Sequence, residues 1–335
     1  MGFLQIGLGS MGKRRIRCLR ALGQSRIWAY DPRVDRRREA HDLYGVEPVA
    51  SIEEGLAMDI DAVLISTPPD LHYASVRDAL AAGKHMFCEA NIVTEGAAEF
   101  TAMARARHLV AAPSATMRFH PLYQHLRRLV VEDKALGRPL ALNFHLGNYI
   151  LDWHPWEGQQ GLDFYGGRRA TGAAREMVPF EFEWMEWVFG PVAAVQCSHR
   201  RQLDLPTDIE DVYAIVAEFR SGLIATILID VIARYPIRDG RLLSQQGSVY
   251  WDFDSNRLRH FHADTGLWRE YKASPRGFNM EEMYIAEIDA FLQACRGQTP
   301  WSHSYQDDER LSRVLLACER SSQSGQRVEL QEEQT

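Results

Sequence analysis

Three glycines near the start of the chain have the spacing of a phosphate-binding turn. Gly7, Gly9 and Gly12 form a G-x-G-x-x-G sequence, and Asp31 follows 19 residues after the last of them. The first glycine permits a tight turn, the second lets the backbone approach a pyrophosphate, and the third lets a helix pack closely on a strand. The N-terminus of that helix attracts phosphate groups. Asp31 would bind ribose hydroxyls, which favours NAD, whereas Arg33 could bind a 2′-phosphate and leaves NADP open.

The elements around this turn alternate between strand and helix. Residues 3–6 and 26–30 form short apolar strands on either side of a helical stretch, and residues 62–66 form a wholly apolar strand of the buried parallel kind. This alternation predicts an α/β fold with a parallel Rossmann sheet, in which residues at the carboxyl ends of the strands line the ligand site. The predicted cofactor-binding residues are Gly7, Gly9, Ser10, Met11, Gly12, Asp31, Arg33, Ser66, Thr67, Pro68, His72, Glu89 and Arg118.

The second half of the chain alternates as antiparallel strands do. We expect two domains, a dinucleotide-binding domain over residues 1–121 and an α+β domain over residues 122–335 that binds substrate and forms oligomers. The elements predicted in the second domain are strands over 212–219, 223–230, 248–253, 258–261 and 267–271, and helices over 280–296 and 305–323.

Several short segments, in order over nearly the whole chain, carry a family resemblance. They are Gly7–Gly12, Ser66–His72, Ala82–His85, Cys88–Glu89, Arg118–Pro121, Trp187–Gly190 and Gly247–Val249. Together they resemble the glucose–fructose oxidoreductase and inositol dehydrogenase (Gfo/Idh/MocA) family. The resemblance implies a C-terminal domain with a large open, mostly antiparallel sheet, assembly into a homodimer or homotetramer through that sheet, and hydride transfer between a sugar carbon and nicotinamide. Residues 147–157 resemble a subgroup linked to amino-sugar and surface-polysaccharide building blocks.

The residues that do the chemistry in this family are replaced in this chain. The family pattern Glu-Lys-Pro corresponds to Glu89–Asn91, where alanine replaces the lysine. The family's aspartate and the histidine base four residues later align with Glu176 and Phe180. Oxidation of an alcohol needs a group that accepts the hydroxyl proton as the hydride leaves, and neither alanine nor phenylalanine can accept it. The candidate catalytic residues are Glu176, His154 and Glu89.

Aromatic and basic side chains supply candidates for substrate binding. The aromatic residues could stack on a sugar ring, and the arginines could bind a phosphate or a nucleotide diphosphate. The alternatives are that the aromatic residues belong to the core, that the arginines are ordinary surface residues, and that the glutamates between 176 and 186 form a solvated helix face. No metal site is predicted. The candidate substrate-binding residues are Tyr149, Trp153, Trp156, Arg168, Arg169 and Arg175.

Composition narrows the partners and the location of the protein. The net charge of −7 argues against a nucleic-acid-binding surface. The five cysteines include no CxxC pair, which favours a reducing compartment over a zinc site or a disulfide framework. No long apolar run and no signal-like segment occur, so we expect a cytoplasmic protein without a membrane partner.

We therefore expect an NAD(P)-dependent oxidoreductase that acts on a hydroxyl of a sugar, sugar nucleotide or polyol through a nonstandard acid–base residue. Two alternatives stay open because the lysine and histidine are missing. One is a cofactor-binding protein without dehydrogenase activity, such as a regulatory or assembly subunit. The other is an enzyme that holds NAD tightly for internal redox cycling.

Overall fold

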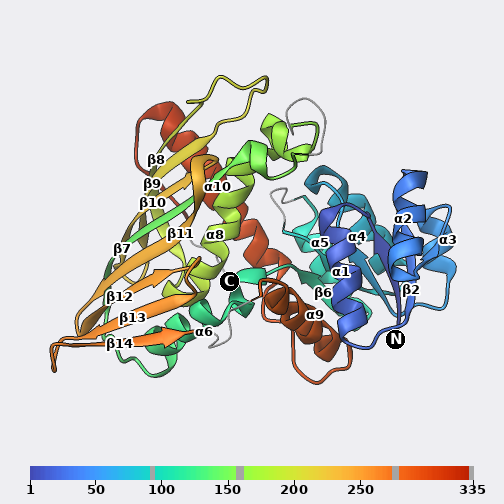
Figure 1. Cartoon of the computed structure of the whole chain (residues 1–335), viewed down its shortest axis with the longest axis horizontal. Helices are drawn as coiled ribbons and strands as arrows, with labels where there is room; N and C mark the ends of the chain where they lie inside the picture. The colour runs from blue at the N-terminus through green and yellow to red at the C-terminus, as the bar shows by residue number, and fades with distance from the viewer. Residues whose placement is uncertain (91–94, 156–161, 274–278, 332–335) are drawn as a thin grey trace. The chain divides into compact units, whose positions relative to one another are not determined.

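The computed structural model describes residues 1–90, 95–155, 162–273 and 279–331, drawn as ribbon in Figure 1. The chain divides into two compact units. Unit 1 contains Met1–Phe119 and Asn279–Arg310, and unit 2 contains His120–Phe278 and Leu311–Thr335.

Unit 1 is built on a parallel sheet. Its strands are β1 (Gly2–Ile6), β2 (Arg26–Tyr30), β3 (Glu47–Pro48), β4 (Ala62–Ile65), β5 (His85–Cys88) and β6 (Ala111–Pro113). Its helices are α1 (Ser10–Ala21), α2 (Val34–Tyr44), α3 (Ile52–Ala57), α4 (His72–Ala81), α5 (Ala97–Ala106) and α9 (Glu281–Cys295), with the short 3-10 turns η1 (Pro69–Leu71) and η2 (Thr116–Phe119). The strand order is β3-β2-β1-β4-β5-β6, and all neighbouring pairs are parallel. The predicted Rossmann sheet is thus confirmed.

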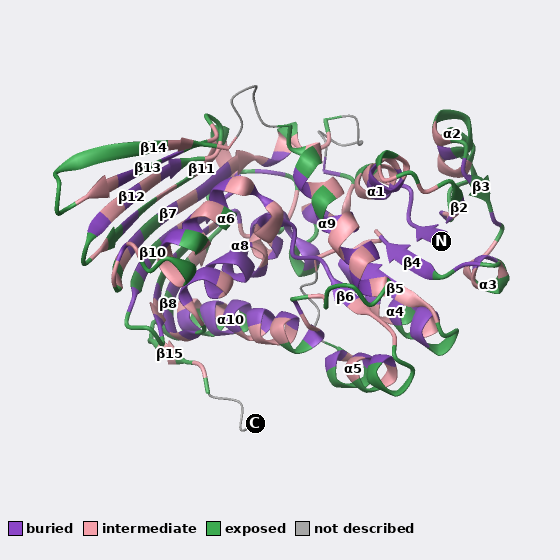
Figure 2. Cartoon of the chain, turned by 90° about the horizontal axis from the view of Figure 1, so that it is seen from below, coloured by how far each residue is buried: buried purple, intermediate pink, exposed green. Residues whose placement is uncertain are grey.

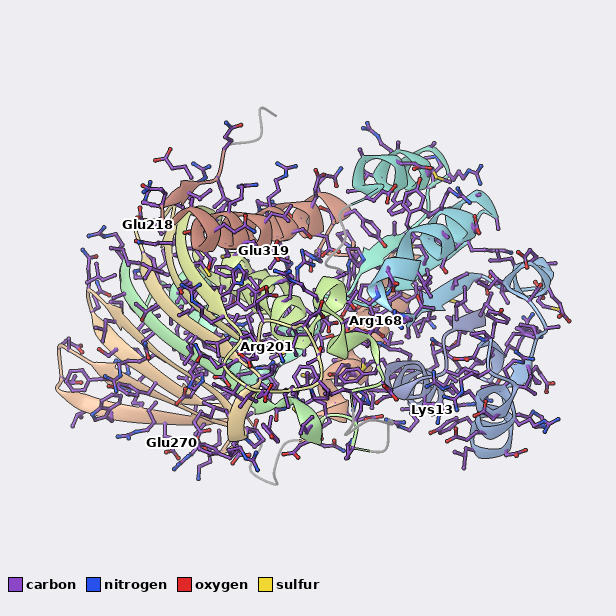
Figure 3. All side chains as sticks on the ribbon, turned by 90° about the horizontal axis from the view of Figure 1, so that it is seen from above. Lys13, Arg168, Arg201, Glu218, Glu270 and Glu319 are labelled. Carbon is purple, nitrogen blue, oxygen red and sulfur yellow. The ribbon has the colours of Figure 1, made fainter. Side chains whose placement is uncertain are left out.

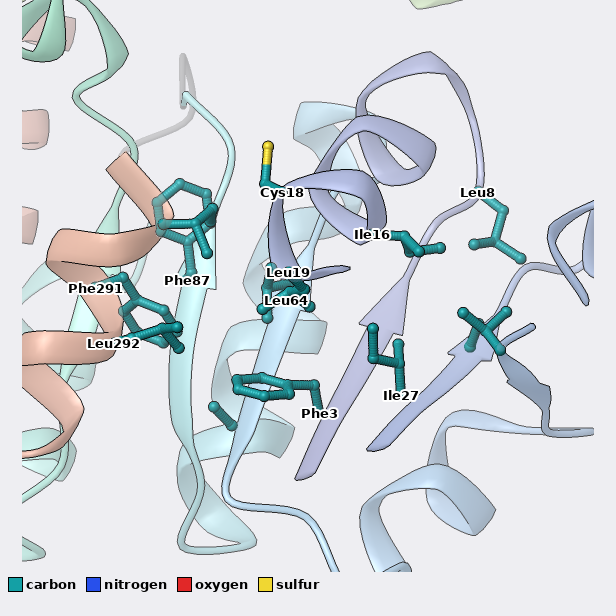
Figure 4. Close-up of a cluster of buried hydrophobic side chains, with 14 of the residues drawn as sticks. Phe3, Leu8, Ile16, Cys18, Leu19, Ile27, Leu64, Phe87, Phe291 and Leu292 are labelled. Atoms are coloured by element: carbon teal, nitrogen blue, oxygen red, sulfur yellow. The ribbon is translucent and has the colours of Figure 1, made fainter. Parts of the chain in front are cut away.

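A helix from late in the chain completes the core of unit 1. Phe291 and Leu292 of α9 pack in one cluster with Phe87 of β5 and Phe3 of β1, as Figure 4 shows. Residues 279–310, which we expected in the second domain, therefore belong to unit 1. The apolar stripe of this helix was visible in the sequence, but its partner was not, because a stripe does not identify the surface that it covers. The division after Phe119 lies close to the expected boundary at 121.

Unit 2 is built on a large mixed sheet. Its strands are β7 (Pro139–Tyr149), β8 (Val192–Arg200), β9 (Val212–Phe219), β10 (Ile224–Asp230), β11 (Ile232–Ser244), β12 (Gly247–Asp252), β13 (Arg257–His262), β14 (Leu267–Lys272) and β15 (Val328–Glu329). Their order is β14-β13-β12-β11-β7-β10-β9-β8-β15. Only the β7–β10 pair is parallel within the described residues, so the mostly antiparallel sheet is confirmed. The long central strands β7 and β11 were not predicted.

Helices cover one face of this sheet. They are α6 (Pro121–Arg127), α8 (Ala173–Phe189) and α10 (Tyr305–Ser324), the last of which begins in unit 1. α8 packs on β9 and β10, and Figure 2 shows it buried along most of its length, whereas the edge strand β14 is exposed. Short helical turns surround these elements: η3 (Arg128–Glu132), η4 (Ile150–Asp152), η5 (Tyr165–Gly167) and η6 (Arg169–Thr171). The turns η5 and η6 lead directly into α8 and carry several of the candidate residues.

Candidate functional site

The glycine-rich turn between β1 and α1 has the shape that its sequence predicts. Gly7 has a φ of +86°, and a Cβ atom there would collide with the carbonyl oxygen of Ser66. A Cβ atom at Gly12 would collide with the carbonyl oxygen of Gly7. At Gly9, by contrast, the nearest atom to an added Cβ is Arg36 Nη1 at 3.8 Å. The first and third glycines are therefore needed for the fold, whereas Gly9 leaves space beside the backbone for a ligand.

The N-terminus of α1 opens onto that space. Gly9 is the N-cap residue, and no side chain caps the first N–H groups of α1. These donors carry the positive end of the helix dipole, which favours an anion such as a pyrophosphate. Ser10 and Met11, predicted to bind the cofactor, are the first residues of this helix. The turn therefore fits a dinucleotide.

Asp31 lies at the carboxyl end of β2 and holds the same turn. One carboxylate oxygen accepts the backbone N–H of Leu8 at 2.8 Å, and the other accepts that of Arg33 at 2.9 Å. The Arg33 guanidinium binds Asp35, while Arg36 Nη1 lies 3.7 Å from Asp31 Oδ2. Asp31 thus fits its predicted role near a ribose, and Arg36 is a second basic residue beside it that the sequence analysis missed.

The predicted residues after β4 form a compact turn. His72 Nε2 contacts the carbonyl oxygen of Thr67 at 2.9 Å, and burial lowers the pKa of His72, so its ring is neutral near pH 7. The histidine thus braces the turn between Ser66 and Pro68. Thr67 Oγ1 is buried and has no hydrogen-bond partner among the residues that the structure describes. A buried hydroxyl of this kind suits a ligand that completes its bonding.

Glu89, predicted to be catalytic, lies in a buried ion-pair network. Arg15 of α1 donates to both of its carboxylate oxygens, at 2.6 and 2.8 Å, and the Ser66 hydroxyl donates a third hydrogen bond at 3.1 Å. Arg15 also donates to Glu287 of α9 at 2.7 Å. Glu287 in turn accepts from the segment after β6, where Ser114 Oγ is one donor at 2.8 Å. Through these bonds Glu89 aligns β4, β5 and α1, and both of its carboxylate oxygens are occupied by donors.

Arg118, also predicted to bind the cofactor, contacts another segment of unit 1. Its guanidinium donates to the carbonyl oxygen of Ser302 at 2.9 Å and lies 3.1 Å from His303 Nδ1. The contact ties η2 to the chain that precedes α10. The geometry therefore gives this arginine a structural contact.

Glu176 of α8 has a partner in unit 2. The Tyr165 hydroxyl donates to Glu176 Oε1 at 3.3 Å. Glu176 is 8% exposed and lies in the first turn of α8, where the helix dipole favours a carboxylate. Tyr165 belongs to η5 and is half-buried. Tyr165 is therefore the less buried residue of this hydrogen-bonded pair.

Other predicted residues lie along the same part of unit 2. The rings of His154 and Phe164 lie 4.4 Å apart, and Phe164 contacts Tyr165 edge to face at 5.6 Å. Trp153 follows η4, and its indole N–H is buried without a hydrogen-bond partner among the described residues. Tyr149 ends β7 and carries the Arg234 guanidinium over its ring at 4.0 Å. These contacts bring His154 near the Glu176 pair. Trp156 lies outside the described residues.

The predicted substrate arginines differ in what they contact. Arg169 donates to Glu210 at 2.6 Å, and Arg175 donates to Glu319 of α10 at 2.6 Å. Arg168 is exposed and is labelled in Figure 3. The first two arginines join segments of unit 2 through ion pairs, and Arg168 lies at the surface.

Two family models match this chain and identify the family to which it belongs. Residues 1–113 match the model of an oxidoreductase family with an NAD-binding Rossmann fold, and residues 123–250 match the GFO/IDH/MocA C-terminal domain. The chain belongs to the Gfo/Idh/MocA oxidoreductase family. The family match with the NAD-binding Rossmann fold lies in unit 1 of this Gfo/Idh/MocA protein and includes the turn that carries Gly7, Gly9 and Gly12.

Relatives of this Gfo/Idh/MocA chain are named as dehydrogenases. The UDP-N-acetylglucosamine 3-dehydrogenase of Acidithiobacillus ferrooxidans is 26% identical over 88% of each chain. The inositol 2-dehydrogenase 4 of Saccharopolyspora erythraea is 27% identical over 87% of this chain and 84% of its own. Among solved structures, levoglucosan dehydrogenase in complex with NADH and levoglucosan has a TM-score of 0.83, covering 98% of this chain and 99% of its own, at 18% identity. The last likeness concerns the fold alone.

The place that the resemblance assigns to the family's histidine is apolar in this Gfo/Idh/MocA chain. Phe180 lies there, and the guanidinium of Arg238 lies 5.8 Å from its ring. Arg238 pairs at 2.8 Å with Glu181, which also accepts the indole N–H of Trp184 at 2.7 Å. Burial raises the pKa of Glu181 although these partners favour its charged form.

The glutamates of α8 do not form a solvated face. Glu176, Glu181, Glu183 and Glu186 are all less than 9% exposed, so that alternative is wrong. The reason is tertiary packing. α8 lies against the sheet and the surrounding turns, and its carboxylates bond to groups there, such as the Val192 N–H that Glu186 accepts at 2.9 Å.

Two further properties concern the whole described chain. No helix there has both the length and the apolar character needed to cross a membrane. No three His, Cys, Asp or Glu side chains in those residues group closely enough to hold a metal ion, and the five cysteines are free thiols.

Proposed function

We propose that this protein oxidises a secondary hydroxyl of a sugar, sugar nucleotide or polyol with NAD, and that Glu176 is the acid–base residue. The observation that carries the second part is the pairing of Glu176 with Tyr165 at the start of α8. The family membership and the intact nucleotide-binding turn support the first part.

The residues of unit 1 would hold the cofactor by the contacts already described. The first N–H groups of α1 would bind the pyrophosphate, and Asp31 would bind the ribose next to the adenine. Thr67 Oγ1 and the turn after β4 would bind the other half of the dinucleotide. When NAD is bound, it accepts the hydride.

Glu176 is the carboxylate best suited to take the hydroxyl proton. Glu89 is held by three donors, and Glu181 is fully buried against Arg238. Glu176 accepts the Tyr165 hydroxyl and thus lies beside a side chain that is only partly buried. A general base must lie within hydrogen-bond reach of the proton that it removes, directly or through one bridging group.

A carbohydrate substrate fits the side chains around this pair. Trp153 offers a ring and an indole donor, and Arg168 offers an exposed guanidinium for an anionic substituent. The relatives are named for UDP-N-acetylglucosamine, inositol and 1,5-anhydro-D-fructose. We therefore propose a polyhydroxylated ring as the substrate class, with or without a nucleotide diphosphate.

Cofactor binding and reduction test this function. Calorimetry with NAD and NADP is expected to show tighter binding of NAD, and absorbance of the reduced nicotinamide is followed with UDP-N-acetylglucosamine, inositol and levoglucosan. Glu176→Gln is expected to lower turnover about 10²- to 10⁴-fold with NAD affinity unchanged. Glu282→Gln, at an exposed site on α9, is the matched control. Binding of NAD without reduction by any of these substrates would contradict the proposed dehydrogenase activity.

We also propose that the open face of the unit 2 sheet joins copies of the chain into a homodimer or homotetramer. Ile224 and Leu243 lie in one row across β10, β7 and β11 and are 53% and 44% exposed, and Val216 in the next row is 41% exposed. Such side chains on a sheet face favour burial against a partner. Sedimentation of Ile224→Arg is expected to give a smaller particle than the wild type, whereas Leu43→Arg on α2 is expected to leave its size unchanged. A monomeric wild type would rule the assembly out.

A further inference from the structure

We propose that Tyr165 is the residue that exchanges a proton with the substrate hydroxyl, and that Glu176 receives the proton through it. This inference rests on the proposed dehydrogenase function and deepens it. It assigns a catalytic role to a residue that replaces neither the family's lysine nor its histidine in sequence position.

Tyr165 and Glu176 differ in how far they are buried. Glu176 is 8% exposed, and it accepts the Tyr165 hydroxyl at 3.3 Å. Tyr165 is the more exposed member. We therefore assign the exchange with substrate to the phenol, which belongs to the less buried residue of the pair. This hydrogen bond joins the phenol directly to the carboxylate, as a proton relay requires.

The backbone around Tyr165 is fixed, as a catalytic side chain requires. Thr171, which is 3% exposed, donates its hydroxyl to the carbonyl oxygen of Tyr165 at 2.6 Å. The N–H of Arg168 donates to the same oxygen at 3.1 Å, and Thr207 donates its hydroxyl to the carbonyl oxygen of Gly167. These bonds hold η5 against the start of α8. Supported groups of this kind keep a reacting side chain in one geometry.

The proposed relay moves one proton from the substrate hydroxyl to Glu176 through Tyr165. The O–H bond of the substrate breaks and its proton goes to Tyr165 Oη, while the proton of Tyr165 goes to Glu176 Oε1. The carbinol carbon is oxidised to a carbonyl carbon as its hydride reduces the nicotinamide. Tyr165 is a neutral phenol before and after this step. Glu176 becomes a carboxylic acid, which then loses its proton to water. The phenol conducts the proton, and the carboxylate supplies the basicity that a neutral phenol lacks near pH 7.

The test compares Tyr165→Phe, Glu176→Gln and the double variant in the full chain, with Tyr235→Phe as the control because Tyr235 is 69% exposed on β11. Turnover is measured against pH with NAD and whichever of UDP-N-acetylglucosamine, inositol or levoglucosan the wild type oxidises. Tyr165→Phe is expected to lower kcat about 10²- to 10⁴-fold with little change in KM. The double variant is expected to be no slower than the slower single variant, because the two residues form one relay.

Two readouts without turnover accompany this series. NAD affinity by calorimetry is expected to be the same in all variants, because unit 1 is unchanged. Thermal unfolding of the cofactor-free variants is expected to show coupling between the two substitutions, as a direct contact requires. A Tyr165→Phe enzyme with wild-type kcat and pH profile would overturn the relay while leaving the dehydrogenase intact. A wild type that reduces no NAD would instead overturn the proposed function, and the relay with it.

Discussion

Arg15 is a fully buried arginine whose guanidinium binds two carboxylates, Glu89 and Glu287. Its charge is matched in place by those partners, since water does not reach it. Taking away one member of such a group leaves the others buried and uncompensated. The energetic role of this residue is therefore larger than that of an ordinary surface arginine, and the network fixes Glu89 at the end of β5.

Arg15→Met is expected to lower the free energy of unfolding of the protein by about 3–5 kcal/mol, because Glu89 and Glu287 lose the buried cation that pairs with both of them. Urea unfolding followed by circular dichroism measures this loss. Arg77→Met is the control, since Arg77 pairs with Asp78 on the surface and both side chains are more than 40% exposed. The control is expected to lose less than about 1 kcal/mol. Equal losses in the two variants would show that the network contributes no special stability.

Some site residues could be predicted from local sequence and others could not. The glycine-rich turn with Gly7 and Gly12, followed by Asp31 after the next strand, could be predicted because it depends on spacing within one strand–turn–helix–strand unit. The contacts of Tyr165 and Arg15 could not be predicted, because each residue bonds to a partner elsewhere in the sequence that no local pattern indicates. Glu287, for example, lies 272 residues from Arg15. The ion pair of Glu89 with Arg15 could not be predicted for the same reason.

At the scale of the element, the turn between β1 and α1 has glycine at two positions for two different reasons. Gly12 must be glycine because the turn packs against it, and Gly9 must be glycine only if a ligand occupies the space beside it. Its φ of −72° is open to any residue. Substitutions at Gly12 and Gly9 therefore test folding and cofactor binding separately.

Gly9→Ala is expected to keep the melting temperature of the wild type while weakening NAD binding at least about tenfold, a loss of about 1.4 kcal/mol in binding free energy. Gly12→Ala is expected to lower the melting temperature, since its Cβ atom collides with the backbone of Gly7. Differential scanning fluorimetry and calorimetry on both variants make the comparison. Unchanged NAD affinity in the Gly9→Ala variant would place the pyrophosphate elsewhere.

The sequence predicted most elements because their patterns are local. β2 and β9 have the predicted bounds, and α9 and α10 each differ from theirs by one residue at one or both ends. The strand β7 was not predicted although Leu140, Leu142, Phe144 and Leu146 alternate with smaller or more polar residues along it. The strand β11 lacks such a regular pattern, and its pairing contains a register shift after Ile232. The sheet order was beyond reach, since pairing between distant strands leaves no local pattern.

At the scale of the whole molecule, His120 makes stability depend on pH. It is fully buried, stacks on Phe253 at 4.2 Å, and accepts the Leu122 N–H at 3.3 Å to cap α6. Burial, with the nearby Arg238 cation, lowers its pKa to about 3. In the unfolded chain the pKa returns to about 6.5. Below that pH the unfolded chain takes up a proton that the folded chain does not.

The free energy of unfolding is therefore expected to fall as pH drops from about 6.5 toward 3, by up to about 1.4 kcal/mol per pH unit from this residue. His120→Asn keeps a helix-capping side chain and is expected to reduce that slope. Urea unfolding at pH 7, 6 and 5 measures it. His108→Asn, at an exposed site with a φ of +55°, is the control and is expected to keep the wild-type slope. Parallel slopes for His120→Asn and the wild type would contradict this assignment.

The late return of α9 to unit 1 sets an order of events during synthesis. A ribosome delivers Met1–Phe119 first, yet Phe291, Leu292 and Glu287 come only after the whole of residues 120–278 has been made. At about 5–20 residues per second, that delay is roughly 10 to 30 seconds. During it, the nascent Rossmann sheet has an uncovered apolar surface beside Phe87, and Arg15 lacks one of its two carboxylates. Most of unit 1 is thus made before residues 120–278, but the unit is complete only after α9 has been made.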